Sequence, residues 1–177
     1  MNSLFDSAPG FDQPLAVLKH CHDRIRKQLA TLDKLQNHLR DHGMDESAQQ
    51  AAKAILRYFN KAAPLHHEDE ENDLMPCLQS CAQGEDAKLL GELVPVILQQ
   101  HGQMGALWSK LRPQLQDIED GSGYDLSEAD TEAFSALYTA HMEIEEGQIA
   151  PMAARLFSAE QMRILGEAMQ ARRGITV

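Results

Sequence analysis

Apolar residues recur at steps of three and four along most of this chain, which is the spacing of amphipathic α-helices. The clearest stretch places Val94, Ile97, Met104, Leu111 and Ile118 on one side of a helix in a heptad arrangement. No stretch sustains the alternation of apolar and polar residues that is typical of a half-buried strand. The pattern therefore predicts five helices, at about residues 13–42, 46–80, 86–118, 128–155 and 159–173.

Capping signals agree with these ranges. Asp45, Ser127 and Ser158 are candidate N-caps, and Gln161 follows Ser158 at the spacing of a capping box. Three prolines fall inside predicted helices and are expected to kink them or to mark breaks: Pro64, Pro95 and Pro113. Four long helices and one short one predict an all-α fold, an up-down four-helix bundle with a short C-terminal fifth helix. The length favours a single domain over residues 1–177.

Polar residues interrupt the apolar stripes of all four long helices. The first and third helices each carry a single histidine there, and the second and fourth each carry a histidine with a glutamate four residues later. These inward-facing candidates are His22, His66, Glu70, His101, His141 and Glu145. Residues four apart on a helix share a face, so each pair offers one nitrogen and one carboxylate from the same helix.

The two pairs belong to a motif that occurs twice. A histidine is followed by two glutamates four and five residues later and by a proline ten residues later, first from His66 to Pro76 and again from His141 to Pro151. We expect the second glutamates, Glu71 and Glu146, to hydrogen-bond near the site or to be solvated rather than to be ligands.

Each of these residues also has an ordinary interpretation. A lone histidine on an apolar face is more often a hydrogen-bonded core residue, and a helical His–Glu pair is usually a surface pair. Burying the whole set without compensation would instead cost several kcal/mol per charge, which is comparable to the stability of a domain. The set together therefore favours a metal centre.

The types of ligand narrow the choice of metal. Imidazole and carboxylate without thiolate suit iron or manganese better than a structural zinc site. Six protein ligands, two of them carboxylates able to bridge, indicate two ions. We expect two iron ions (Fe2+/Fe3+) with an oxo, hydroxo or water bridge, and manganese or zinc as possible substitutes.

These residues resemble the hemerythrin-like HHE cation-binding family of non-haem di-iron proteins. The resemblance covers nearly the whole chain and rests on four segments, Cys21–Ile25, His66–Pro76, His101–Trp108 and His141–Pro151. It implies that the six inward-facing residues are the ligands, with Glu70 and Glu145 bridging.

One departure concerns the third helix. Oxygen-carrying hemerythrins have a further histidine one turn after the third-helix ligand, where this chain has Gly105. His67 is the candidate for the missing imidazole, since it lies about 100° around the helix from His66. A half-exposed histidine that is not a ligand is an equally good interpretation of His67.

The resemblance implies a protein that binds O2 or a related diatomic such as NO, for carriage, storage or sensing. A second hypothesis is a role in the NO or oxidative stress response or in iron–sulfur centre repair. Family members with that role have one histidine from each of the first and third helices, as this chain does. A third is an iron-responsive sensor or interaction module. The sequence shows no general acid, nucleophile or substrate pocket, so a binding protein is favoured over a redox enzyme.

Charge and cysteine content bear on partners and compartment. The net charge of −11 argues against a nucleic-acid partner. The apolar stretches are too short to cross a membrane, and the N-terminus lacks the features of a secretion signal. Three scattered cysteines, of which Cys77 and Cys81 are expected to be packing residues, favour a cytoplasmic location. The apolar residues of the predicted fifth helix allow a homodimer.

Overall fold

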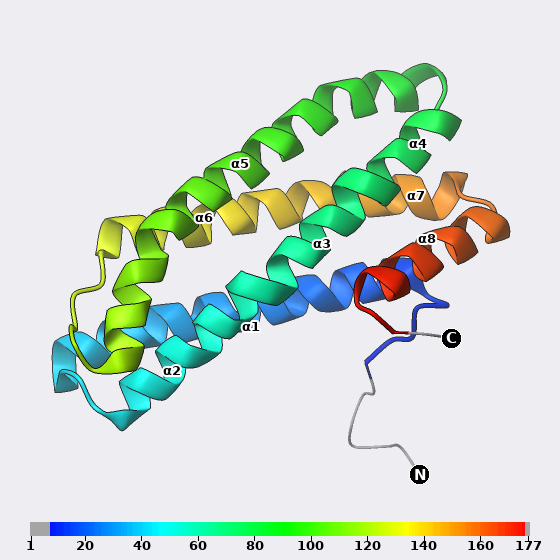
Figure 1. Ribbon diagram of the computed structural model, residues 1–177. Coiled ribbons are helices and arrows are strands. Elements are labelled where there is room, and N and C mark those ends of the chain that lie inside the picture. The colour runs from blue at the N-terminus through cyan, green and yellow to red at the C-terminus, as the bar shows by residue number, and fades with distance from the viewer. Residues whose placement is uncertain (1–7, 176–177) are drawn as a thin grey trace, which may run out of the picture.

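The chain forms a bundle of helices in the computed structural model, which describes residues 8–175 (Figure 1). The first helix, α1, spans Pro14–His42, and the third, α5, spans Gly84–Asp120. The fifth, α8, spans Ala159–Arg172. No strand occurs within residues 8–175, so the predicted all-α bundle with a C-terminal helix is confirmed.

The second and fourth helices are continuous but contain wider turns. The second runs from Glu46 to Cys81 as α2 (Glu46–Arg57), η1 (Tyr58–Ala62), α3 (Ala63–Asp69), η2 (Glu70–Leu74) and α4 (Met75–Cys81). The fourth runs from Glu128 to Leu156 as α6 (Glu128–Ile144), η3 (Glu145–Ile149) and α7 (Ala150–Leu156). The three η segments are π-helical turns, in which a backbone N–H bonds to the carbonyl five residues earlier.

Each π-helical turn ends two residues before a proline. The prolines are Pro64 after η1, Pro76 after η2 and Pro151 after η3. A proline donates no N–H, and its ring clashes with the carbonyl four residues earlier. The wider turn relieves that clash and lets the helix continue. By contrast, Pro95 and Pro113 mark no break, because both lie inside the continuous helix α5.

The predicted caps are present at three helix starts. Asp45 accepts a hydrogen bond from the N–H of Ala48, and Ser127 accepts one from the N–H of Asp130. Ser158 and Gln161 form the reciprocal capping box at the start of α8. These side chains satisfy backbone donors that the first helical turn leaves without partners.

Two apolar clusters fill the bundle on either side of a polar layer. One contains Leu29 and Leu32 of α1 with Ile55, Leu111 and Phe134. The second cluster includes Leu18, Leu78, Ile97, Ile149 and Met152. The fold thus places the inward-facing histidines and glutamates in one layer between two regions of core.

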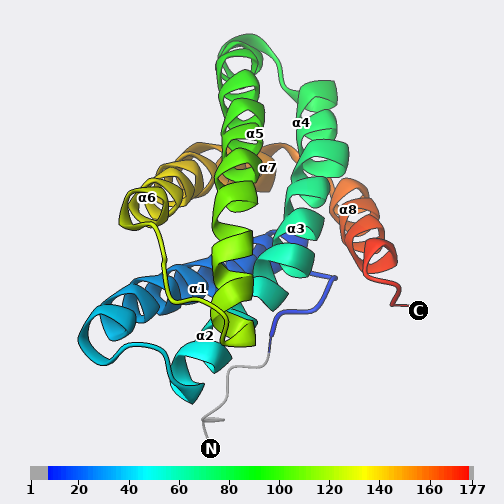
Figure 2. The ribbon, with the colours of Figure 1, turned by 60° about the vertical axis from the view of Figure 1, so that its left-hand side comes forward.

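The C-terminal helix α8 lies outside the four long helices and packs against α1, α3 and η2 (Figure 2). Its approach to the segment before α1 is close. A Cβ atom on Gly166 would lie 1.9 Å from the carbonyl oxygen of Phe11, so this contact requires glycine. Within the described residues, no helix is long and apolar enough to cross a membrane.

Candidate metal centre

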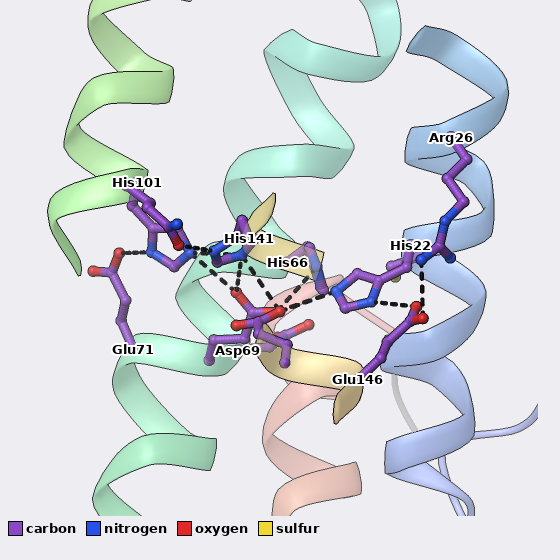
Figure 3. A network of polar contacts seen from close by, with 12 residues as sticks. His22, Arg26, His66, Asp69, Glu71, His101, His141 and Glu146 are labelled. Atoms are coloured by element: carbon purple, nitrogen blue, oxygen red, sulfur yellow. Dashed lines mark hydrogen bonds and ion pairs between the residues drawn. The ribbon is translucent and has the colours of Figure 1, made fainter. Parts of the chain in front are cut away.

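All seven of the predicted site residues meet in the polar layer between the two apolar clusters. Four helices supply them, α1, α5 and the second and fourth helices (Figure 3). Six are almost entirely buried, with exposed fractions of at most 8%: His22, His66, Glu70, His101, His141 and Glu145. His67 is only half-buried as a residue, but its Nε2 atom is buried.

Both carboxylates lie between two groups of imidazoles. The donor atoms of His22, His66, Glu70 and Glu145 lie within 4.8 Å of one another. Those of Glu70, His101, His141 and Glu145 form a second such group, and those of His67, His101 and His141 a third. Two cation positions that share Glu70 and Glu145 would therefore have two imidazoles on one side and three on the other.

The oxygens of Glu70 divide between the two sides. Its Oε1 lies 3.0 Å from Nε2 of His66, and its Oε2 lies 3.3 Å from Nε2 of His101. Oε2 of Glu145 lies 3.0 Å from Nε2 of His22 and 3.4 Å from Nε2 of His141. This is an arrangement in which a carboxylate can bridge two ions.

The other ring nitrogen of three histidines is hydrogen-bonded away from the centre. Nδ1 of His22 donates to Glu146 over 2.9 Å, and Nδ1 of His101 donates to Glu71 over 2.5 Å. Nδ1 of His141 donates to Oε1 of Gln100 over 3.1 Å. A histidine that donates from Nδ1 has its Nε2 lone pair free for a metal, and the acceptor fixes the orientation of the ring. The second glutamates of the repeated motif therefore act on histidines of α1 and α5, and they are not merely solvated.

Glu146 is itself held in place by α1. Its second oxygen accepts a hydrogen bond from Arg26 over 2.9 Å (Figure 3). The Arg26 hydrogen bond is the largest cause that lowers the pKa of Glu146, which falls to about 2. Glu146 is therefore a carboxylate at neutral pH and can accept the proton of His22.

Several polar atoms of the layer are buried without a hydrogen-bond partner among the described residues. They are Nδ1 and Nε2 of His66, Nε2 of His67, both carboxylate oxygens of Glu70 and Oε1 of Glu145. Buried polar atoms without partners are rare, because each costs about 1–3 kcal/mol. Nitrogen lone pairs and carboxylate oxygens gathered in this way are suitable ligands for a cation of the iron or manganese type.

The charge states fit the same interpretation. Burial by itself would raise the pKa of Glu70, but the nearby charges of His66, His101 and His22 hold that pKa well below its usual value. Burial lowers the pKa of His67 well below its usual value, and His101 adds to the effect. Burial would also lower the pKa of His22, but the hydrogen bond to Glu145 and the nearby carboxylate of Glu70 raise it to about 9. Without a cation, protons on the histidines balance the carboxylates.

A cavity of about 310 Å³ reaches the centre on the side with two imidazoles. His22, Glu70 and Glu145 line its inner end. Most of the remaining lining is apolar and consists of Leu15, Leu18, Leu74, Ile149 and Ala150. Lys19 and Glu146 are the other charged residues of the cavity. A small uncharged molecule could reach this side of the centre through the cavity.

Aromatic rings border the side of the centre that has three imidazoles. His67 stacks on His101, with ring centroids 4.0 Å apart, and on Tyr138 at 5.9 Å. Tyr138 is otherwise packed among Phe59 and Phe134, so it is the core tyrosine that its place in the apolar stripe indicates. A Cβ built on Gly105 would meet no atom of another helix within 4 Å, so the space there is open. His67 instead supplies an imidazole to this side from the second helix.

Sequence reasoning did not find Asp69 and its two arginine partners next to the centre, nor Gln100 and Arg26. Asp69 precedes Glu70 and is fully buried, and it forms ion pairs with Arg172 and Arg173 at the end of α8. Arg172 also pairs with Asp73 over 2.5 Å. The only signal for Asp69 in the sequence was its place on the inner side of a helix. Its partners Arg172 and Arg173 lie 103 and 104 positions further along the chain.

Comparison with known proteins agrees with the geometry. Residues 13–153 match the family described as the hemerythrin HHE cation binding domain, and the chain belongs to this family. It is also 29% identical over 165 residues to an uncharacterized protein of Haemophilus influenzae, a match that covers 93% of this chain and 92% of that protein. The resemblance seen in the sequence is therefore confirmed, and the matched segment stops before α8.

Proposed function

We propose that this protein holds two iron ions in the polar layer and binds O2 or a related diatomic such as NO there. The proposed ligands are His22, His66, Glu70, His101, His141, Glu145 and His67. Glu70 and Glu145 would be shared, His22 and His66 would bind one ion, and the other three histidines would bind the second. When bound, the iron pair would supply the electrons and the open coordination position that diatomic binding requires.

The observation that supports this proposal most strongly is the sharing of the two carboxylates between two groups of imidazoles. A surface ion-pair network would not explain five imidazoles and two carboxylates around one buried layer. The unequal numbers of histidines on the two sides give a further argument. The side with two imidazoles is less fully ligated, and it is the side that the 310 Å³ cavity reaches.

The chain's own residues would perform three tasks. Glu71, Glu146 and Gln100 hold histidine rings in orientation through Nδ1. Leu18 and Leu74 help to keep the cavity apolar, which favours a small uncharged molecule over water or an anion. Nδ1–H of His22, bonded to Glu146, keeps its proton away from the open position.

The proposal is tested by reconstituting the protein with ferrous iron without oxygen and measuring the iron content per chain. We expect about two ions, and an absorption spectrum that changes with O2 and reverts under vacuum. One ion or none would contradict the proposed centre. Two ions with no response to O2 but with turnover of NO would favour the stress-response hypothesis, and manganese or zinc retained in place of iron would contradict the choice of metal.

A further inference from the structure

We propose that a basic groove between α1 and the second helix is a binding site for a small phosphate-bearing anion. The groove has a volume of about 780 Å³, and its lining includes Arg24, Gln28, Lys53, Arg57, Tyr58 and Lys61. It shares no lining residue with the cavity that reaches the metal centre. This site is therefore separate from the proposed iron site.

The charge of the groove is opposite to that of the protein. The chain carries 27 acidic and 16 basic residues, yet the lining of the groove includes four basic residues and no acidic one. Within residues 8–175, the ion pairs of lysine and arginine involve other positions, such as Lys19, Arg155 and Arg163. The positive charge in the groove is thus not neutralised by neighbouring carboxylates of the described chain.

The second helix contributes three of these cations in one row. Lys53, Arg57 and Lys61 follow one another at steps of four, which places them on the same side of the helix. Like charges at this spacing repel and weaken a helix by a few tenths of a kcal/mol per pair. A multivalent anion between the row and Arg24 of α1 would turn this repulsion into attraction.

Arg24 is positioned by its surroundings. Its guanidinium carbon lies 5.1 Å from the ring centroid of Tyr58, at the distance of a cation–π contact. Tyr58 is buried, and its hydroxyl donates to the carbonyl of Cys21 over 3.2 Å. Arg24 therefore lies over a fixed aromatic ring at one wall of the groove, and a guanidinium can bind a phosphate through two parallel hydrogen bonds.

Gln28 adds a polar side chain to the lining of the groove. Its Oε1 atom is buried and has no hydrogen-bond partner among the described residues. That oxygen is an acceptor and cannot bind an anion, so what Gln28 offers a phosphate is its amide N–H group.

A small anion fits better than a nucleic acid. A concave site that concentrates positive potential attracts a small multivalent ligand, whereas the net charge of −11 repels a long polyanion from the rest of the surface. The volume of about 780 Å³ lies in the range of sites that hold small organic molecules. The chemistry of the ligand is therefore that of a diphosphate or an organic phosphate.

Calorimetric titration of the metal-loaded protein with inorganic pyrophosphate at low ionic strength tests this inference. We expect saturable binding of one pyrophosphate per chain. The double variant Arg57→Gln/Lys61→Gln should raise the Kd at least tenfold, because two exposed cations are removed without disturbing the core. Lys88→Gln on α5 makes the same kind of charge change on an exposed lysine outside the groove, and it should leave the Kd within twofold.

Several results would overturn the inference. They are the absence of saturation, an equal loss of binding in Lys88→Gln, and a single-stranded oligonucleotide that binds more tightly than pyrophosphate. Extraction of iron by pyrophosphate would also produce heat, but that heat would be the same in the groove variant. Equal titrations of the wild type and the double variant would therefore count against the groove. A metal-content measurement after each titration separates this result from a failure of the iron site.

Discussion

At the scale of single residues, the two nitrogens of a histidine have different tasks. In His22 and His101, Nδ1 donates outward to a glutamate while Nε2 points to the shared carboxylates. The repeated motif supplies both kinds of contact, since Glu70 faces the centre and Glu71, the next residue, faces a histidine of another helix. Adjacent glutamates thus serve one site in two ways.

Glu146→Gln should lower the affinity for the metal by about 10- to 100-fold, because an amide holds the His22 ring less firmly and polarises it less than a carboxylate does. The affinity is measured by competition with a chelator. Glu143→Gln removes an exposed carboxylate three residues earlier and is the matched control. An equal loss in both variants would show that overall charge, and not the contact with His22, is responsible.

Removing single ligands should lower the metal content in a graded way. His67→Ala is expected to weaken the binding of one ion without abolishing it, because His101, His141 and the two shared carboxylates still match the donor set of the other side. Glu145→Ala removes a group shared by both sides and should leave about one ion or none. His38→Ala is the control, since His38 bonds to Asp45 at a surface helix start. Elemental analysis would contradict the assignment if His38→Ala lost as much metal as Glu145→Ala.

At the scale of elements, the π-helical turns connect the prolines to the ligands. Glu70 begins η2 and Glu145 begins η3, and each turn closes with a bond from the N–H five residues later to the glutamate's own carbonyl. A proline follows each turn, and the wider geometry accommodates its ring. The repeated motif therefore encodes a local backbone shape as well as a set of ligands.

The end of α8 also acts on the second helix. Among the ion pairs of the described chain, the fully buried Asp69 is neutralised only by Arg172, the last residue of α8, and by Arg173, which follows it. Because Asp69 directly precedes Glu70, these ion pairs hold the start of η2 in place. The arginines that form them lie beyond residues 13–153, the part of the chain that matches the family.

Asp69→Asn should lower the free energy of unfolding by about 3 kcal/mol, because it leaves the partly buried Arg173 without its counter-charge and Arg172 with Asp73 and Glu68 alone. Chemical denaturation measures this loss. Glu160→Gln, which breaks an exposed pair with Arg163 on the same helix, should leave the denaturation midpoint unchanged. If Asp69→Asn proved as stable as the wild type, α8 would have no role in holding the second helix.

At the scale of the whole molecule, the centre joins four helices through their most polar side chains. The apolar clusters lie on both sides of it and shield most of its polar groups from water. Metal binding and folding are therefore expected to be coupled.

Metal removal should lower the melting temperature, because ions that bind only the folded state stabilise it by mass action. The added stability is about 2.7 kcal/mol when the free metal concentration is 100 times the Kd. Calorimetry of the protein before and after chelation, and again after reloading with ferrous iron, measures the change. Equal melting temperatures in the metal-free and reloaded forms would mean that the buried layer needs no cation.

The helices, the caps and the six inward-facing residues can be predicted from the amino-acid sequence alone. Apolar periodicity reports which side of a helix is buried, and the repeat from His66 to Pro76 and from His141 to Pro151 marks two helices with the same role. These features depend on residues close together in the chain. Local spacing is therefore sufficient to reveal them.

The contacts between distant segments are visible only in the folded structure. It placed His67 beside His101 and His141, a choice that periodicity left open because a residue 100° around a helix can face either a neighbour or solvent. It paired Asp69 with α8, joined Glu146 to His22, and gathered Arg24 and Lys53 in one groove of an acidic protein. Such contacts depend on how helices pack, and residue spacing within one helix carries no information about which residues of another helix lie opposite.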